Sequence, residues 1–411
     1  MGKFEGMPCE NVGKTFLPST GSTCLFCRMV FLIPSLFLGT AYLLILAVYR
    51  YGWYISGKSR SIYPDQAPQV SVIVPMRNEA RNLPELMKSL LSQKYPREKF
   101  EIILVDDGSE DNTLDMAKEY ADVHPNVRVI WNELVASGYS GKKKAIETGI
   151  AVASGDWIVC TDADCSHHPL WLKALAAPSA QGKSFAAAPV VFKTNPNLLS
   201  VFQTIDFLTL QGITAASVAL RFHSMCNGAN LAYSRSAFYE VDGFKDIDSL
   251  PTGDDMLLMH KIYKYHPDGI SYLRSKEAVV TTVAPGSWRD FFQQRIRWAS
   301  KAAYYDDKRI LWVLMMVYLF NAWILAIMVW AFFSQEAMGW LIILFCTKTI
   351  AELCFIWPVA GFFEKRKWLW WFPLLQPFHI LYTVLAGWLG RFGSYKWKGR
   401  TILKPSTLSR Q

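Results

Sequence analysis

The chain has 411 residues, of which 51% are hydrophobic and 19% are charged, and its formal net charge is +9. The length exceeds that of one small domain, and the apolar content is high for a protein that is soluble throughout. Positive charge is concentrated in a basic tail, residues 391–411, which contains no acidic residue. This tail suits anionic lipid headgroups. No nucleic-acid recognition motif accompanies the charge, so we expect membrane lipids and no nucleic acid as partners.

Four apolar blocks are candidates for membrane-spanning segments. Residues 29–49 carry no charge and have about the 20-residue length that a bilayer span needs. This block is long, follows a weakly basic segment and precedes no small-residue cleavage site, so we interpret it as an anchor and not as a cleavable signal. The other three blocks are residues 311–333, 339–363 and 368–390.

The charges of the loops predict the orientation of these segments. The basic loop at residues 364–367 is expected in the cytoplasm, together with the soluble region between the first two blocks. A crossing by residues 368–390 would put the basic tail outside, against the same rule. Because Pro373 and Pro377 interrupt that block, we expect a transmembrane or a re-entrant segment there. The protein is thus expected to be integral to the inner or plasma membrane, with a cytosolic soluble domain.

The soluble region alternates short apolar strands with helices. An N-terminal extension (residues 1–28) and a polar linker (residues 50–69) flank the first block. The pattern predicts an α/β fold with a mostly parallel sheet covered by helices on both faces. Ligands of such sheets bind beyond the carboxyl ends of the strands. The expected strands are residues 70–74, 101–105, 127–131 and 156–161, and the expected helices are residues 83–93, 112–123 and 142–154.

A further apolar stretch, residues 199–222, resembles a membrane span in length but contains Gln203, Asp206 and Gln211. A crossing here would separate the acidic clusters before and after it on opposite sides of the membrane. We therefore expect a helix that lies at the bilayer surface or packs on the sheet.

The most informative motif is Asp162-Ala163-Asp164, which follows an apolar strand. Two carboxylates at a strand end can hold a divalent cation, and that cation can bind a nucleotide diphosphate. The motif alone is weak evidence. Two further elements follow it in the chain: Gly253-Asp254-Asp255 and the segment Gln294-Arg295-Ile296-Arg297-Trp298.

Together with Val74-Pro75-Met-Arg-Asn-Glu79, Val105-Asp-Asp-Gly-Ser109 and Gly141-Lys142, these motifs resemble membrane-bound family 2 glycosyltransferases, which are related to cellulose, hyaluronan and ceramide-glucose synthases. The resemblance covers roughly residues 69–301. It implies a GT-A-like, Rossmann-like domain at residues 70–285 and an interfacial helix at residues 286–309. It also implies transfer, with inversion, of a sugar from a nucleotide-diphosphate donor (a UDP-sugar in particular) to a lipid-linked glycan or glycolipid acceptor.

The resemblance also implies roles for individual residues. Asp255 matches the catalytic base, and Asp164, with Asp162, matches the site of Mg²⁺ or Mn²⁺. Trp298 and Asp254 match acceptor contacts. The residues that match donor contacts are Pro75, Glu79, Asp107, Lys142, Asp162, Gln294 and Arg297.

Elementary chemistry supports several of these roles. A departing diphosphate needs its growing negative charge neutralised, which a divalent cation and an arginine fork can do. The attacking hydroxyl needs a positioned base, and the start of a helix favours the ionised form of Asp255. Gln294 and Arg297 are three residues apart and so lie on one helical face.

Each motif alone also has a structural interpretation. Asp107 could cap a helix, and the Gln-x-x-Arg-Trp segment could be an interfacial amphipathic helix. His167 and His168 could add metal ligands, but no third ligand is fixed nearby, so we expect a loop. Lys348 and Glu352 lie on one helix face inside an apolar block, where a self-neutralising pair is expected.

Three alternative functions remain at this point. A processive synthase of an extracellular polysaccharide carries the same motifs, but its channel needs several packed spans and only three or four are visible. A catalytically silent, nucleotide-sugar-binding membrane scaffold would not need Asp162, Asp164, Asp255 and Arg297 together. A nucleotidyltransferase has a similar sheet, but the Gln-x-x-Arg-Trp segment is unexpected there.

Overall fold

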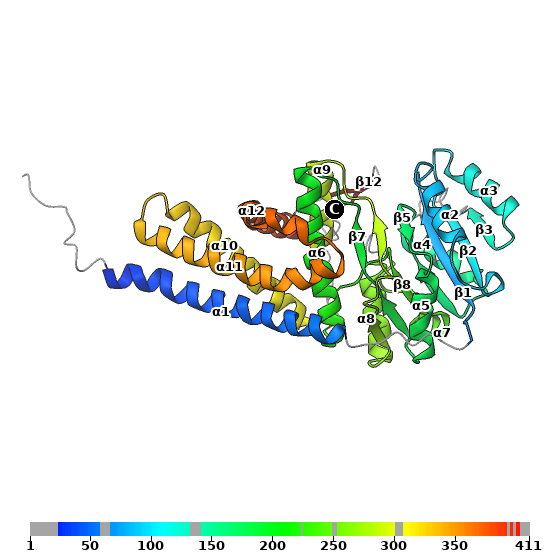
Figure 1. Ribbon diagram of the computed structural model, residues 1–411, viewed down its shortest axis with the longest axis horizontal. Coiled ribbons are helices and arrows are strands. Elements are labelled where there is room, and N and C mark those ends of the chain that lie inside the picture. Colours follow the sequence, from blue (N-terminus) through cyan, green and yellow to red (C-terminus); the bar gives the residue numbers. More distant parts are fainter. Residues whose placement is uncertain are drawn as a thin grey trace, which may run out of the picture.

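The computed structural model describes residues 24–57, 66–131, 141–222, 225–248, 253–300, 307–392, 395–397 and 400–402. An α/β domain occupies one end of an elongated molecule, and three long helices project from it (Figure 1). These are α1 (Cys24–Ser56), α10 (Lys308–Trp330) and α11 (Gln335–Phe362). Parts of the expected N-terminal extension, linker, interfacial segment and basic tail lie outside the described residues.

The main sheet has seven strands in the order β3-β2-β1-β4-β8-β6-β9. The four predicted strands are present and form one parallel group, as expected. Beyond β4 the sheet is mixed, because β8 runs antiparallel to both β4 and β6, and β9 is parallel to β6. The bounds are β1 (Val70–Met76), β2 (Phe100–Asp106), β3 (Val127–Trp131), β4 (Trp157–Cys160), β6 (Phe185–Ala187), β8 (Leu231–Ser234) and β9 (Ile270–Tyr272).

Helices cover both faces of this sheet, which explains why the parallel strands are almost continuously apolar. In β1, Ile73 points to the core shared with Ile146 of α4. Its neighbours Val72 and Val74 point to the opposite core, with Trp171 of α5. The helices of the domain are α2 (Leu83–Leu91), α3 (Thr113–Val123), α4 (Lys142–Ala151), α5 (Trp171–Ala180), α7 (Arg235–Glu240) and α8 (Met256–Tyr265), with the short 3₁₀ helix η1 (Arg97–Lys99) before β2.

A second, three-stranded sheet lies beside the first and has the order β5-β10-β7. Its strands are β5 (Cys165–His167), β7 (Val190–Phe192) and β10 (Val280–Thr282). Strand β5 begins directly after Asp164 and pairs with β10. This small sheet therefore fixes the direction in which the chain continues from the Asp162-Ala163-Asp164 motif. Two short strands near the C-terminus, β11 (Tyr395–Trp397) and β12 (Arg400–Ile402), pair with each other.

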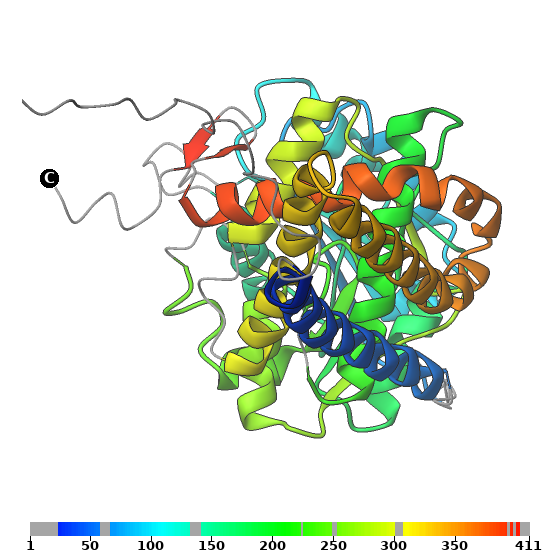
Figure 2. The ribbon, with the colours of Figure 1, turned by 90° about the vertical axis from the view of Figure 1, so that its left-hand side faces the viewer.

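Two further helices run across the three long ones, next to the α/β domain (Figures 1 and 2). They are α6 (Leu198–Ala219) and α12 (Phe372–Phe392), the latter preceded by the 3₁₀ helix η4 (Arg366–Trp371). Helix α9 (Trp288–Ser300) packs against α12. Helix α6 contacts α1 and α11 on one side and β7 and β9 on the other. Of the two placements expected for residues 199–222, the structure thus has the one in which the helix packs on the sheet.

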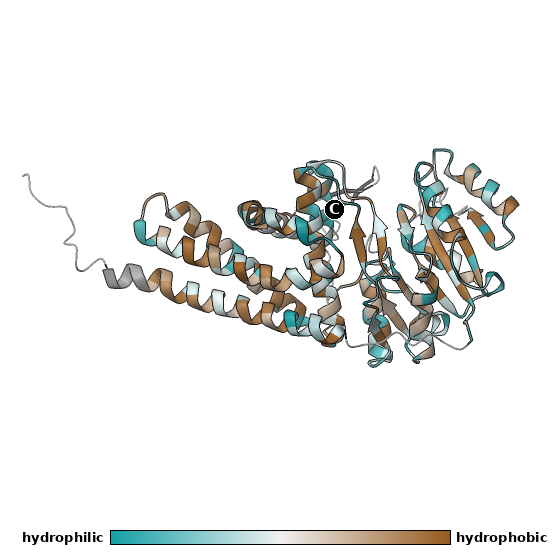
Figure 3. Cartoon of the chain, viewed as in Figure 1, coloured by the Kyte–Doolittle hydropathy of each residue, from teal (hydrophilic) through white to brown (hydrophobic). Residues whose placement is uncertain are grey.

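Five helical segments of the described chain are long and apolar enough to cross a membrane: Met29–Ser56, Leu198–Ala219, Lys308–Trp330, Gln335–Phe362 and Arg366–Gly390. Burial separates α6 from the rest, since 72% of its apolar window is buried inside the protein against 28–33% in the other four. Apolar residues line α1, α10 and α11 along their length (Figure 3). Helix α1 continues to Ser56, so the first part of the expected linker is helical.

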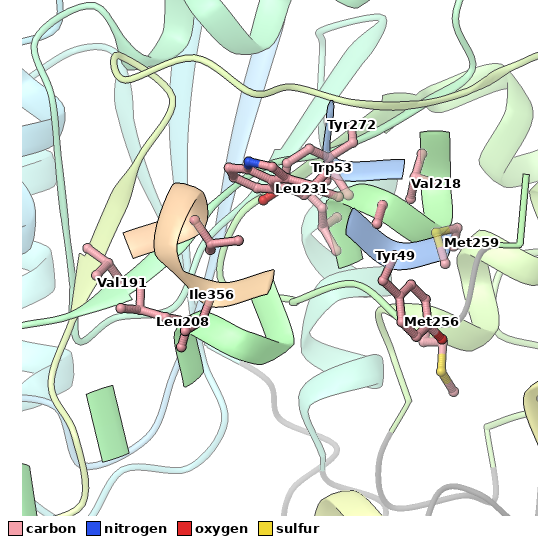
Figure 4. Close-up of a cluster of buried hydrophobic side chains, with 14 of the residues drawn as sticks. Tyr49, Trp53, Val191, Leu208, Val218, Leu231, Met256, Met259, Tyr272 and Ile356 are labelled. Carbon is pink, nitrogen blue, oxygen red and sulfur yellow. The ribbon is translucent and has the colours of Figure 1, made fainter. Parts of the chain in front are cut away.

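The long helices and the α/β domain share one hydrophobic core (Figure 4). Trp53 of α1 and Ile356 of α11 meet Leu208 of α6 and Tyr272 of β9 in this core. Because this core is continuous, side-chain packing holds the domain against the long helices, in addition to the covalent connections.

Candidate active site

One cavity at the carboxyl ends of β1, β2 and β4 contains all the side chains that the motifs single out. Its volume is about 290 Å³. The predicted residues that line it are Pro75, Glu79, Asp107, Lys142, Asp162, Asp164, Asp254, Asp255, Gln294, Arg297 and Trp298. Segments separated by more than two hundred residues therefore converge where the fold predicts a ligand.

The two strand-end acids of Asp106-Asp107 have different roles in the structure. Asp106 accepts hydrogen bonds from the backbone N–H groups of Gly108 and Ser109, which makes it the structural residue of the turn. Asp107 lines the cavity, and its Oδ1 accepts a hydrogen bond of 3.2 Å from the backbone N–H of Gly141. That contact joins the end of β2 to the start of the helix that carries Lys142.

Asp164 lies in a crowded acidic environment. Burial, followed by the charges of Asp162 and Glu79, raises the pKa of Asp164 to about 6. Bringing carboxylates together is unfavourable unless a cation compensates them. Among the described residues, no cluster of three or more His, Cys, Asp or Glu side chains could hold a metal ion by itself. A cation at this pair would thus need oxygen ligands from a bound molecule.

His167 is a structural residue, but the expected loop is wrong for it, because His167 is the last residue of strand β5. Its Nε2 lies 2.9 Å from the Thr161 hydroxyl and its Nδ1 lies 2.9 Å from the Ser89 hydroxyl. Burial lowers the pKa of His167 to about 3, so the imidazole is neutral. His168 uses its Nδ1 to accept the backbone N–H of Leu170.

Lys142 bridges two of the acids in the cavity. Its Nζ lies 2.7 Å from Asp162 and 3.1 Å from Asp254. Burial opposes the charge of the ammonium group, but these two carboxylates outweigh it, and the pKa of Lys142 is raised well above its usual value. A fixed positive charge therefore stands between the acidic pair and the start of α8.

Asp255 is held in a defined orientation at the start of α8. Its Oδ1 accepts the backbone N–H of Met256 at 2.7 Å, and its Oδ2 accepts the backbone N–H of Gly228 at 3.2 Å. A Cβ at position 228 would lie 2.9 Å from both Asp254 Oδ2 and Lys142 Nζ. The sequence does not single out Gly228, because nothing in its local pattern indicates that the chain returns to the cavity there.

Helix α9 presents Gln294, Arg297 and Trp298 to the cavity. Arg295, between them in sequence, lies on another face and is buried against Asp206 of α6. In the sequence alone, Asp206 indicates only that the apolar stretch 199–222 does not span a membrane. Its pairing with Arg295 joins residues 89 positions apart, which no local spacing reveals.

A second, larger cavity of about 1170 Å³ adjoins the first. The two share Glu79, Asp164, Val283, Gln294 and Arg297. The second cavity, which we call the outer groove, opens between the N-terminal parts of α2, α6 and α9. Its cationic side chains, besides Arg297, are Arg81, Lys193 and Arg289.

Comparison with known families identifies the chain. The model of glycosyl transferase family 2 matches residues 71–242, and the model of glycosyl transferase family group 2 matches residues 157–391, which is more than half of the chain. The chain belongs to the family 2 glycosyltransferases. The resemblance inferred from the motifs, and the GT-A-like fold with it, is confirmed.

Curated relatives are similar over part of their length. Glycosyltransferase AglE of Haloferax volcanii is 29% identical over 45% of this chain and 56% of the relative. The undecaprenyl-phosphate 4-deoxy-4-formamido-L-arabinose transferase of Proteus mirabilis is 34% identical over 28% and 34%, respectively. The poly-beta-1,6-N-acetyl-D-glucosamine synthase of Staphylococcus epidermidis is 25% identical over 57% and 54%. The chain thus spans about half the length of most of these relatives.

Among solved structures, the mannosyltransferase PcManGT from Pyrobaculum calidifontis, in complex with GDP-Man and Mn²⁺, is similar in fold. The TM-score is 0.57 and the sequence identity is 19%, over 87% of this chain and 98% of that one. This similarity extends the shared fold to most of the chain.

Proposed function

We propose that this protein is a metal-dependent, inverting glycosyltransferase that moves a sugar from a nucleotide-diphosphate donor to a membrane-associated acceptor. The observation that carries the proposal is that Asp164, Asp255 and Arg297 line one cavity, although they come from distant parts of the chain. An inverting transfer needs these three kinds of group around one reacting carbon: a cation site, a base and a clamp for the diphosphate.

The base in this proposal is Asp255. It accepts the proton of the acceptor hydroxyl while that oxygen bonds to the anomeric carbon and the bond from that carbon to the diphosphate oxygen breaks. Support comes from its two backbone hydrogen bonds, which aim the carboxylate before substrate arrives. A preorganised base avoids the cost of reorientation during reaction.

The donor side contains the residues that hold the diphosphate. Asp164 and Asp162 hold the divalent cation, Mg²⁺ or Mn²⁺, which neutralises charge on the leaving group when bound. Hard carboxylate oxygens suit such a cation, whose charge would offset the repulsion of Asp164 by Asp162 and Glu79. The fold relative PcManGT was solved with GDP-Man and Mn²⁺. Arg297 and Gln294 contact the diphosphate from α9, and Lys142 contacts it from α4.

The remaining donor contacts are Pro75, Glu79 and Asp107, which hold the base and ribose of the nucleotide at the ends of β1 and β2. A UDP-sugar is the donor that the family resemblance favours. Trp298 provides an aromatic plane for the acceptor sugar or headgroup, and Asp254 lies on the acceptor side.

The acceptor in this proposal is a lipid-linked glycan or a glycolipid that enters by the outer groove. This groove adjoins the catalytic cavity and is bordered by α6 and α9, the helices next to the membrane-facing part of the protein. One relative is named as an undecaprenyl-phosphate transferase. The domain is expected on the cytosolic side, because the basic loop 364–367 lies on its side of α11.

A processive polysaccharide synthase is the second candidate, and similarity to the poly-beta-1,6-N-acetyl-D-glucosamine synthase favours it. The packing of the long helices argues for the lipid acceptor. Glu352 of α11 accepts hydrogen bonds from Tyr42 of α1, Lys348 of α11 and Gln376 of α12. The expected self-neutralising pair of Lys348 and Glu352 is therefore present, and these buried side chains occupy the space between the helices.

The test is a donor screen on the purified full chain in detergent. Nucleotide diphosphate release is measured from several nucleotide sugars, with and without Mn²⁺ or Mg²⁺ and extracted lipids. We expect one donor to be turned over only with metal and lipid, and chelation with EDTA to abolish release. A product of many sugars would favour the synthase. No turnover, combined with unchanged cellular function of an Asp255→Asn chain, would favour the scaffold.

A further inference from the structure

A buried ion pair lies on the side of α9 that faces away from the cavity. Arg295 and Asp206 are 4% and 5% exposed. The Arg295 Nε donates to Asp206 Oδ2 at 2.8 Å, and Nη2 lies 2.6 Å from the same oxygen. Tyr382 of α12 donates its hydroxyl to the other oxygen, Asp206 Oδ1, at 2.6 Å. The pair therefore ties α9 to α6 and α12 together at one point.

Arg295 also contacts two residues that line the catalytic cavity. Its Nη1 donates a hydrogen bond of 2.6 Å to Oε1 of Gln294. Its guanidinium carbon lies 4.2 Å from the ring centroid of Trp298, within the range of a cation–π contact. One buried side chain thus contacts both the donor-side amide and the acceptor-side aromatic ring.

The hydrogen bond to Gln294 has a chemical consequence. A guanidinium group has only donors, so it selects the oxygen end of the Gln294 amide. The NH₂ group of Gln294 is then available as a hydrogen-bond donor. A donor suits the anionic oxygens of a diphosphate better than the carbonyl oxygen, an acceptor, would. A glutamine without this contact could present either end.

We propose that Arg295 is a positioning residue for glycosyl transfer, which sets the amide of Gln294 and the ring of Trp298 and is itself oriented by Asp206 and Tyr382. This inference rests on the proposed function of the cavity. Small displacements of groups that orient substrate cost rate, because reaction needs near-attack geometry. Arg295 itself does not touch the reacting atoms.

A purely structural ion pair and a positioning residue respond differently to substitution. Lysine at position 295 retains a charge for Asp206 but provides a single ammonium group, without the fork that reaches Gln294 or the plane that stacks on Trp298. Replacement of a whole buried ion pair by neutral side chains of similar volume is often tolerated in stability. Stability and positioning can therefore be separated.

The experiment compares Arg295→Lys with the parent as full chains in detergent. Measurements are the thermal midpoint, kcat, KM for donor and acceptor, and the ratio of sugar transfer to donor hydrolysis. We expect a thermal midpoint within a few degrees of the parent, kcat/KM for the acceptor lower by about 10- to 100-fold, and a larger share of hydrolysis. Unchanged kinetic constants and transfer ratio would overturn the proposal.

Two further variants control for folding. If Arg295→Lys does not fold, the double variant Asp206→Asn, Arg295→Met is measured with the same criteria, since it leaves no unpaired charge. The control is Lys348→Met with Glu352→Gln, which removes another buried ion pair whose side chains line neither cavity. We expect this control to leave both KM values and the transfer ratio unchanged, whatever its effect on the thermal midpoint.

Failure of the proposed function is distinguished by a binding measurement. If the parent turns over no nucleotide sugar, binding of UDP and GDP with Mn²⁺ still tests Arg295 through Gln294. Binding that is more than about threefold weaker in Arg295→Lys supports positioning, and equal binding contradicts it.

Discussion

At the scale of the residue, neighbouring acids of the same type receive different tasks from their surroundings. Asp106 accepts hydrogen bonds from backbone N–H groups of its own turn, whereas Asp107 lines the cavity. Asp254 pairs with Lys142, whereas Asp255 is held by two backbone N–H groups. Chain position alone does not separate the members of either pair, since one member of each pair has a partner from a distant segment: Gly141 for Asp107 and Lys142 for Asp254.

The first prediction concerns Asp255. Asn at this position keeps the size but cannot take a proton, so the rate of sugar transfer should fall by about a hundred- to ten-thousand-fold. Binding of nucleotide diphosphate should change little, because Asp255 does not hold the donor. Steady-state kinetics and calorimetry check both points. Asp156→Asn is the matched control on an exposed surface, and a rate above a tenth of the parent in Asp255→Asn would exclude the base role.

The second prediction concerns Gly228, where an added methyl group would lie 2.9 Å from Asp254 Oδ2 and from Lys142 Nζ. Ala at this position should displace both groups and the N–H that orients Asp255. We expect kcat to fall at least about tenfold, because misplaced catalytic groups lose near-attack geometry. Gly339→Ala is the control, since no atom lies within 4 Å of an added Cβ there. Equal activity of the two variants would show that the contact is unimportant.

At the scale of the element, α6, α9 and α12 form one unit with two functions. Their aromatic side chains meet, with ring centroids 4.8 Å apart for Phe202 and Phe378 and 5.5 Å apart for Phe202 and Phe291. One face of α9 lines the cavity and another binds Asp206. Because α6 also packs on α1 and α11, the position of the cavity-lining residues on α9 depends on the long helices.

The third prediction tests the contact between α6 and α11 at Gly212. A Cβ there would lie 2.7 Å from Val359 Cγ2 and 3.0 Å from Phe355 Cζ, so the helices approach closely only without a side chain. Gly212→Val should overpack this contact and reduce stability by about 1–3 kcal/mol. Thermal unfolding in detergent measures the loss, again with Gly339→Ala as control. A thermal midpoint equal to that of the parent would mean that the helices are not in contact.

At the scale of the whole molecule, α1, α10 and α11 extend in one direction, whereas α12 crosses them (Figure 2). If the three long helices span the bilayer, α12 lies near its surface and the basic tail stays on the side of the catalytic domain. This arrangement satisfies the loop-charge rule, which a fourth span would violate.

The fourth prediction follows from that arrangement. In a chain whose native cysteines are replaced, single cysteines are placed at Ser334, Tyr239 and Ser406. A membrane-impermeant thiol reagent applied to intact cells should label position 334, between α10 and α11, and leave positions 239 and 406 unlabelled until the cells are opened. Labelling of position 406 from outside would show that α12 crosses the membrane.

Local pattern was sufficient for the first half of the catalytic domain. Each predicted strand and helix from Val70 to Cys160 exists, with differences of a few residues at the ends, because strong apolar runs and turn residues determine such elements locally. The mixed part of the sheet was not predictable, since β6, β8 and β9 are only three or four residues long and their partners are distant in sequence.

The amino-acid sequence by itself determined which residues were candidates for the site, since acids after strands and a Gln-x-x-Arg-Trp helix indicate a chemical role through their residue types and spacing. Only the tertiary structure decided how those residues are held: Gly228 contacts Asp255, Arg295 contacts Asp206, and most of α6 is buried inside the protein. The physical reason is that a side chain's task depends on partners brought by long-range packing, and residue spacing contains no information about segments that meet only after folding.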